Sequence, residues 1–373
     1  MRIELLIVLA LAVGATFFVL VVAVGLLINK LLESRQTRKR QRLSDLYSEI
    51  FAEILLQPLP ETAGTDRFRY YEELIEPVKN GLAWSTPARK RQHLDAIRQV
   101  LLKFAGDLVG ESMSRLLYFF DSLGFVKDEL KMLRSRKWWV RARAARDLGV
   151  LRVKKSLQPL TAALEDDHPD VQNEAIKSLA KLSGVEALRT ILKTSKSMSL
   201  WTTLELSVIV KESEEEAFPY LIEALGYQDQ SVVLFSLEML AEIGFVSAVE
   251  PVISMVETYP NIVVRAKAAE VLGRLGDQRA EPLLKELLTN PYPLLRTSAT
   301  SALERIGSTT SVPILKERMS TGPVEERISA ARAMARSGEP GLRELRDAVI
   351  SGDDVIRGIA AHVLEEVEGV ETE

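Results

Sequence analysis

Histidine and cysteine, which often serve as general bases, nucleophiles and metal ligands, are rare or absent in this chain. It has no cysteine and only three histidines, His93, His168 and His362, which lie far apart in the sequence. The lack of cysteine excludes disulfide scaffolds, thiolate metal sites and cysteine nucleophiles. The sequence also has no Gly-Lys-Ser/Thr phosphate-binding loop and no Gly-x-Ser-x-Gly elbow. We therefore expect a protein that is not an enzyme and has no cofactor.

One acidic turn has the composition of a divalent-cation site. Glu165, Asp166, Asp167, His168 and Asp170 lie within six residues, and their oxygen and nitrogen atoms are common metal ligands. The same residue types also start helices, because they accept hydrogen bonds from the free N–H groups of a first turn. We expect a turn with a helix cap here, and no metal.

A basic and aromatic run, KWWVRAR, occupies residues 137–143. It belongs to the stretch 127–155, which holds 11 basic and 3 acidic residues. Four side chains of the run could form a basic surface: Lys137, Trp138, Arg141 and Arg143. Nucleic-acid binding through 127–155 is one alternative function, since indoles stack on bases and guanidiniums contact phosphates. The net charge of −4 disfavours a nucleic-acid partner, and we expect Trp139 to fill a boundary between helical segments.

Acidic residues gather farther along the chain. Residues 30–155 carry a net charge of +10, residues 156–373 carry −14, and residues 212–259 hold 10 acidic and no basic residues. An acidic surface attracts a partner with a basic surface. We predict that a protein partner contacts residues in this acidic stretch: Tyr220, Glu223, Tyr227 and Glu238.

The first thirty residues predict a membrane anchor. Leu5 to Ile28 contains 24 residues without a charge, which as a helix would span roughly 36 Å, more than the roughly 30 Å hydrocarbon core. We expect residues 3–29 to contact the lipid bilayer. The alternative is a cleaved signal peptide, whose apolar region is typically about 7–15 residues long.

Basic residues after this span predict its orientation. Six of them follow it, whereas Arg2 alone precedes it: Lys30, Arg35, Arg38, Lys39, Arg40 and Arg42. Positive residues stay on the cytoplasmic side. We therefore expect a single-pass protein with its N-terminus outside and the rest in the cytoplasm, at the inner membrane if the source is a bacterium.

Beyond residue 137 the sequence repeats with a period of 31. Apolar residues recur at Val140, Val171, Val233, Val264 and Leu295, and prolines recur at 251, 282 and 313. The position after each apolar residue is often a long polar side chain: Arg141, Gln172, Arg265, Arg296 and Arg327. A fixed period of this size indicates stacked helix pairs. We expect Gly149, Gly273 and Gly307 to cap the first helices and the prolines to open the second ones.

These segments carry a family resemblance. LEDDHPDVQNEAIKSLAKL, NIVVRAKAAEVLGRLGDQRAEPLLKELL and PLLRTSATSALERIGSTTSVPILKERM resemble HEAT repeats, in the short form of about thirty residues named after phycobilisome lyases. The resemblance implies an all-α fold ending in a right-handed α-solenoid, and a membrane-anchored HEAT-repeat protein of bacterial type. Units 199–229 and 230–260 lack the repeat Arg and Ala.

Three regions follow from these patterns. We predict an anchor at 1–30, a helical module that caps the solenoid at 31–136, and the solenoid at 137–369. Its repeats are expected near 137–167, 168–198, 199–229, 230–260, 261–291, 292–322 and 323–353, with a terminal helix at 354–368.

The expected function is a membrane-anchored, non-enzymatic scaffold for protein partners. The partners are expected to be membrane-associated, and the resemblance points to a membrane enzyme such as a glycosyltransferase. A lyase-like or metal-dependent enzyme subunit is the alternative from another functional class.

Overall fold

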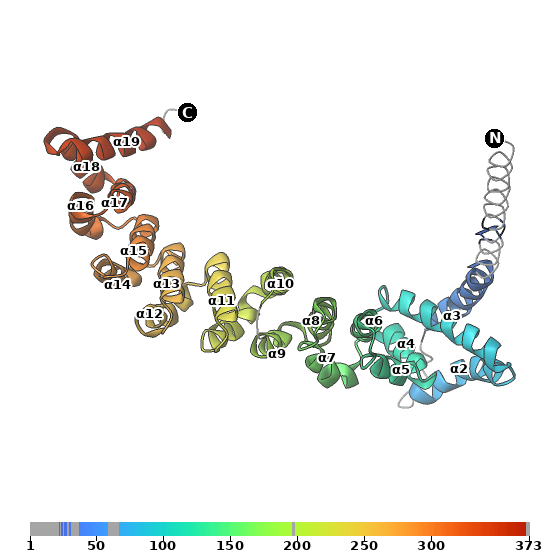
Figure 1. Ribbon diagram of the computed structural model, residues 1–373. Coiled ribbons are helices and arrows are strands. Elements are labelled where there is room, and N and C mark those ends of the chain that lie inside the picture. The colour runs from blue at the N-terminus through green and yellow to red at the C-terminus, as the bar shows by residue number, and fades with distance from the viewer. Residues whose placement is uncertain are drawn as a thin grey trace, which may run out of the picture. The chain divides into compact units, whose positions relative to one another are not determined.

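A computed structural model describes residues 22, 24, 26, 27, 30, 37–58, 67–195 and 198–370 (Figure 1). All regular elements in these ranges are helical. Residues 37–56 form the first well-described helix. The others are α2 (Arg67–Ala83), α3 (Pro87–Ala105), α4 (Gly110–Ser122), α5 (Phe125–Met132), α6 (Trp138–Val150), α7 (Leu157–Ala163), α8 (Pro169–Ser183), α9 (Ala187–Thr194), α10 (Leu200–Ala224), α11 (Gln230–Ile243), α12 (Val249–Thr258), α13 (Ile262–Leu275), α14 (Glu281–Leu287), α15 (Pro293–Ile306), α16 (Val312–Thr321), α17 (Val324–Arg336), α18 (Glu339–Ser351) and α19 (Asp354–Val370).

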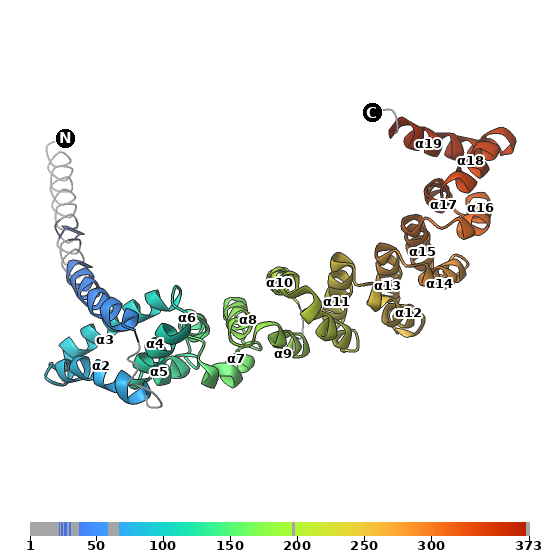
Figure 2. The ribbon, with the colours of Figure 1, turned by 180° about the vertical axis from the view of Figure 1, so that it is seen from behind.

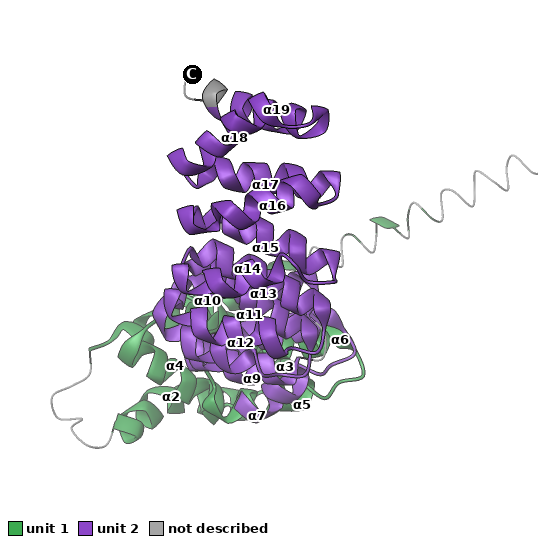
Figure 3. Ribbon diagram, turned by 90° about the vertical axis from the view of Figure 1, so that its left-hand side faces the viewer, with its two compact units in different colours: residues 1–156 green, residues 157–373 purple. Residues whose placement is uncertain are grey.

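The chain divides into two compact units, residues 1–156 and 157–373 (Figure 3). The helix that opens the first predicted repeat, α6, therefore belongs to unit 1. The domain limits drawn from the sequence stay a prediction.

A buried arginine joins α4 to helix 37–56 in unit 1. Arg115 of α4 is 1% exposed, and its Nη1 donates to the carbonyl oxygens of Ile54 and Gln57 at 2.6 and 2.9 Å. The last carbonyls of a helix have no partner within it, so the guanidinium stabilises the end of helix 37–56. Its carbon Cζ lies 5.5 Å from the ring centre of Tyr71, and Phe51, Leu55 and Phe119 are buried nearby in the unit's core.

Unit 2 is a stack of helix pairs (Figures 1 and 2). The first helices α13, α15 and α17 start at residues 262, 293 and 324, in steps of 31, and each packs against the next. One face of each is lined by alanines such as Ala268, Ala299 and Ala330, all fully buried. Small side chains at these positions let neighbouring helices approach closely, and stacking buries faces that no single pair could bury.

The repeated polar position has a structural role. Arg265 Nε donates to the carbonyl oxygen of Val256 at 2.6 Å, Arg296 Nη1 to that of Asn290 at 2.9 Å, and Arg327 Nε to that of Gly322 at 2.6 Å. Gln172 makes the equivalent bond to Asp166 at 2.6 Å. Each side chain thus ties the start of one repeat to a carbonyl near the end of the preceding second helix.

The two atypical units differ at this position. Thr203 and Leu234 stand where the others have Arg or Gln, so this tie is absent from both. Helix α10 also runs through a kink at Glu214, whose φ and ψ of 17° and −94° are not helical. The two helices expected for unit 199–229 are therefore joined directly, whereas 3₁₀ turns join α11 to α12, α13 to α14 and α15 to α16.

The expected caps are partly wrong. Gly307 does follow α15 with a left-handed φ of 66°, and Pro282 and Pro313 lie in the first turns of α14 and α16. Gly149 and Gly273, however, lie inside α6 and α13. The glycine that ends α13 is Gly276, with φ 71°, because the helix continues one turn beyond the point we expected.

No helix in the part of the chain that the structure describes is long and apolar enough to cross a bilayer. The predicted span from Leu5 to Ile28 lies almost wholly outside the described residues, so the anchor stays a prediction. The same is true of the contact of residues 3–29 with lipid.

Candidate functional site

Helix α10 carries an apolar face that is open to solvent. Leu200, Trp201, Leu204 and Val208 are 78, 52, 50 and 53% exposed. Residues 200, 204 and 208 are four apart, and Trp201 lies beside them, so they share one side of the helix. We call these four residues the α10 face.

The opposite side of α10 is also apolar. Leu206 and Val210 are fully buried, and Thr202 is 5% exposed. They pack into the stack, where α10 contacts α8, α9 and α11. The stack buries only one of these two apolar sides. The other side is exposed to solvent, and exposed apolar patches of this kind mark interaction sites.

A charged rim borders the α10 face. The Lys177 ammonium lies 5.7 Å from the ring centre of Trp201 and 2.9 Å from Glu205 Oε1. The cation over the indole ring adds attraction. Charged groups at the edge and apolar groups at the centre are the usual composition of a protein interface.

Three of the four predicted contact residues lie together, at the other end of α10. Arg189 Nε is 2.8 Å from Glu223 Oε2, and Tyr227 donates its hydroxyl to Glu223 Oε1 at 3.0 Å. The Arg189 guanidinium also lies 5.3 Å from the ring centre of Tyr220. The hydrogen bonds from Arg189 and then Tyr227 hold the pKa of Glu223 below its usual value.

The fourth predicted residue lies elsewhere. Glu238 of α11 pairs with Lys267 at 2.7 Å and with Arg274, both on α13. Glu242 likewise pairs with Lys211 at 2.6 Å, and Glu250 with Arg279 at 3.5 Å. Four of the ten acidic side chains in 212–259 are thus paired with cations outside that stretch, and a count of charges along the sequence does not show this.

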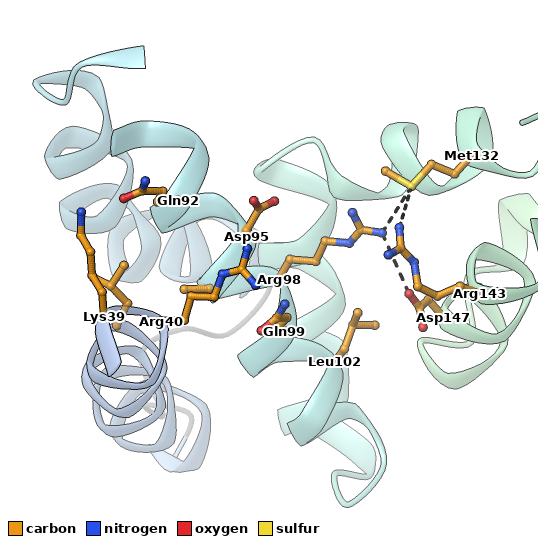
Figure 4. Close-up of a pocket in the computed structure, with 12 residues that line it drawn as sticks. Lys39, Arg40, Gln92, Asp95, Arg98, Gln99, Leu102, Met132, Arg143 and Asp147 are labelled. Carbon is orange, nitrogen blue, oxygen red and sulfur yellow. Dashed lines mark hydrogen bonds and ion pairs between the residues drawn. The ribbon is translucent and has the colours of Figure 1, made fainter. Parts of the chain in front are cut away.

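Unit 1 contains a cavity of about 560 Å³ (Figure 4). Helix 37–56, α3, the end of α5 and α6 form its walls, and four cationic side chains line it: Lys39, Arg40, Arg98 and Arg143. Sequence reasoning grouped Lys39 and Arg40 with the membrane-flanking residues and Arg143 with a basic surface. It missed Arg98, because nothing in the sequence marks the approach of α3 to α6.

A buried carboxylate lies behind this cavity. Glu129 is fully buried and forms an ion pair with Arg98, whose Nη2 also lies 4.0 Å from Asp147 Oδ2. Burial raises the pKa of Glu129 to about 7; repulsion from Asp147 adds to this, and the charges of Arg98 and Arg143 oppose it.

The predicted basic surface is only partly a free surface. Lys137 is exposed, with its ammonium 5.5 Å from the Trp139 ring centre, and Trp138 packs edge to face on Trp139. Arg141 Nη1 donates to the Ser135 carbonyl at 2.9 Å. Our expectation that Trp139 fills a boundary is wrong, since it is 54% exposed; it lies in the first turn of α6 and points away from the core.

Five of the six basic residues that follow the predicted span lie in the part of the chain that the structure describes. Lys30, Arg38, Lys39, Arg40 and Arg42 are exposed. Arg35 lies outside the described residues.

The acidic turn forms the expected cap. His168 Nδ1 accepts from the backbone N–H of Asp170 at 3.3 Å, and Asp166 Oδ1 accepts from that of His168 at 3.0 Å. Across the described ranges, no cluster of histidine, aspartate and glutamate side chains has the arrangement of a metal site.

Comparison with known proteins gives a family match. The HEAT-repeat family matches residues 127–199 and 249–336. No curated protein matches the chain.

Solved structures with similar folds share little sequence with it. The complex of CpcE and CpcF of phycocyanin lyase from Nostoc is 19% identical, covers 63% of this chain and 94% of its own, and has a TM-score of 0.31. Human deoxyhypusine hydroxylase is 15% identical, with coverages of 81% and 98% and a TM-score of 0.29. Kap121p bound to Nup53p is 13% identical, with coverages of 87% and 41% and a TM-score of 0.43.

Proposed function

Because the chain carries HEAT repeats over residues 127–199 and 249–336, we propose that it is a membrane-anchored, non-enzymatic scaffold that binds a protein partner through the α10 face. Stacked helix pairs present extended surfaces to partners. A membrane anchor would confine such a surface to two dimensions and raise its effective concentration toward membrane-associated partners.

The observation that carries this proposal is the exposure of Leu204 and Val208 on a helix whose opposite side is already buried. Their counterparts one repeat later, Phe235 and Met239, are only 5 and 4% exposed. The same positions are therefore covered in the next repeat and open in this one. The α10 face lies in the unit that departs most from the repeat pattern, which is where we expect a specific function.

The partner should offer an apolar surface bordered by basic residues. Leu204 and Val208 require apolar contacts. Glu212 lies one turn beyond Val208, and Glu214–Glu216 lie at the kink in α10, so that a basic rim on the partner would meet negative charge. A membrane enzyme such as a glycosyltransferase is one class of partner that meets the requirement for membrane association.

Cross-linking in intact membranes tests the proposal. A photoreactive amino acid at position 208 should give a discrete protein adduct, and Leu204→Lys should reduce it at least fivefold. Thr203→Lys, on the same helix beside the face, is the matched control and should leave the adduct unchanged. Adducts to lipid alone, or equal yields from both variants, would contradict a protein partner at the α10 face.

A further inference from the structure

The unit 1 cavity is lined by charged side chains that have no part in the proposed scaffold function. Four cations and two carboxylates line it: Lys39, Arg40, Arg98, Arg143, Asp95 and Asp147. Its volume of about 560 Å³ lies in the range of small-ligand sites, about 300–1,000 Å³. The charged part of the lining thus has an excess of positive charge, and it comes from three separate helices: helix 37–56, α3 and α6.

Two guanidiniums converge at one end of the cavity. Arg98 Nη2 lies 3.5 Å from the sulfur of Met132, and Arg143 Nη2 lies 3.3 Å from the same atom (Figure 4). A thioether sulfur is a weak acceptor, and two like charges close together repel each other. Glu129 and Asp147 offset part of this repulsion. An anionic oxygen between the two guanidiniums would offset more of it and accept the strong, charge-assisted hydrogen bonds that guanidinium groups favour.

The position of the Arg98 side chain is fixed before such a ligand binds. Its side chain is 14% exposed, and the buried Glu129 fixes its position. Arg143, Lys39 and Arg40 are exposed, so they can adjust to a ligand that enters. A site with one fixed cation and several adjustable ones loses less entropy on binding than a site made only of exposed side chains.

The carboxylates narrow the class of ligand. Asp95 and Asp147 line the same cavity as the four cations, and they would repel a ligand that is anionic throughout. They can accept hydrogen bonds from hydroxyl or ammonium groups. Asp147 lies at the guanidinium end, 4.0 Å from Arg98 Nη2, and Asp95 lies farther along the cavity on α3. The complementary molecule therefore has a phosphate group with hydrogen-bond donors close to it.

From this pattern we propose that the unit 1 cavity binds a phosphate ester that carries hydroxyl or ammonium groups, and that the phosphate lies between Arg98 and Arg143. The headgroup of a phospholipid and a soluble phosphomonoester share this chemistry. The lipid source rests on the proposed function, since Lys39 and Arg40 follow the predicted span by only eleven and twelve residues.

A binding measurement on the full chain in uncharged detergent tests the cavity itself. Glycerol 3-phosphate and phosphoethanolamine are titrated calorimetrically into the wild type, Arg143→Gln and Arg146→Gln. Arg146 lies on the same helix and does not line the cavity, and its Nε lies 3.9 Å from Asp147 Oδ1, so it is the matched control for the loss of one nearby positive charge. We expect saturable binding that Arg143→Gln weakens at least tenfold and Arg146→Gln leaves within twofold.

A second arm distinguishes the source of the ligand. The full chain is reconstituted in nanodiscs of phosphatidylcholine alone or with one third phosphatidylethanolamine, and bound lipid is counted by native mass spectrometry. Retention of phosphatidylethanolamine that Arg143→Gln abolishes indicates the lipid headgroup; binding of the soluble esters alone indicates a phosphomonoester.

Two outcomes overturn the proposal: no saturable binding in either arm, or equal binding by Arg143→Gln and Arg146→Gln. Failure of the chain to stay in nanodiscs would contradict the membrane anchor instead, and the calorimetric arm would still decide whether the cavity binds a phosphate ester.

Discussion

At the scale of single residues, Glu129 shows how burial sets chemistry in this fold. Its carboxylate is paired with Arg98, yet one of its oxygens, Oε2, is buried without a hydrogen-bond partner. The cost of removing that charge from water exceeds the attraction of the arginine, and the pKa rises from 4.5 to about 7. The folded protein therefore binds a proton at Glu129 more tightly than the unfolded chain does.

This shift predicts a pH-dependent stability of unit 1. Because the folded-state pKa is the higher one, the stabilisation is complete below pH 4.5 and is lost as the pH rises through about 7. The free energy of unfolding should fall by an amount on the order of 3 kcal/mol between those values. Urea unfolding of a Trp201→Phe variant measures it, since the other three tryptophans all lie in unit 1.

Two variants separate Glu129 from other carboxylates. Glu129→Gln should remove most of the fall, whereas Asp128→Asn, its exposed neighbour on α5, should retain it. A fall of equal size in both variants would show that another group is responsible.

At the scale of helices, a close contact between α13 and α15 in the stack depends on a glycine. A Cβ atom built on Gly273 of α13 would lie 2.4 Å from Ala302 Cα and 2.7 Å from Ala302 Cβ on α15. Real Cβ atoms do not approach other atoms so closely, and the obstacle is mostly backbone. The two helices pack against each other at a distance that only glycine allows here.

Two glycine substitutions should therefore have opposite effects. Gly273→Ala should destabilise the protein by about 1–3 kcal/mol, because overpacking outweighs the gain in helix propensity. Gly358→Ala in α19, where a Cβ meets no atom within 4 Å, should stabilise it by about 1 kcal/mol. Thermal unfolding of the two variants measures both signs, and a stabilising Gly273→Ala would contradict the packing of α13 on α15.

The same helices show what the sequence could and could not predict. The period of 31 and the family resemblance predicted the helix pairs, because each repeat uses the same local rules. The position of Gly273 was misjudged, since its role depends on Ala302, 29 residues away. Arg98 was missed for the same reason: Glu129 and Asp147, its partners, lie on α5 and α6, and no local pattern joins them to α3.

Charge pairing across helices explains why the acidic stretch in the sequence differs from the paired side chains in the structure. Glu223 and Glu238 appear in the sequence as part of an uninterrupted acidic stretch. In the fold, Arg189 reaches Glu223 from 34 residues earlier, and Arg274 reaches Glu238 from 36 residues later. Such pairs form at about one repeat's separation, because stacking places neighbouring repeats side by side. The net charge around an acidic stretch in a solenoid is thus less negative than its composition suggests. The apolar α10 face is therefore the more specific indication of a binding surface in this region.

At the scale of the whole molecule, the charge gradient and the predicted span together predict one topology. Six basic residues from Lys30 to Arg42 follow the span and one precedes it, and moving such charges across a bilayer is disfavoured. The +10 net charge of residues 30–155 would then lie nearest the anionic lipid surface, and the −14 of residues 156–373 farther along the chain. Each basic residue near the surface adds about 1 kcal/mol of attraction to anionic lipid.

The absence of cysteine makes this topology directly testable. Single cysteines replace Glu4, before the span, and Glu317, which is exposed on α16. In right-side-out vesicles a membrane-impermeant maleimide should label Glu4→Cys and should reach Glu317→Cys only after the membrane is permeabilised, because the predicted orientation places the repeats inside. Labelling of Glu317→Cys before permeabilisation would contradict the predicted orientation. Release of the chain from the membrane by carbonate would contradict the predicted anchor, on which the scaffold proposal depends.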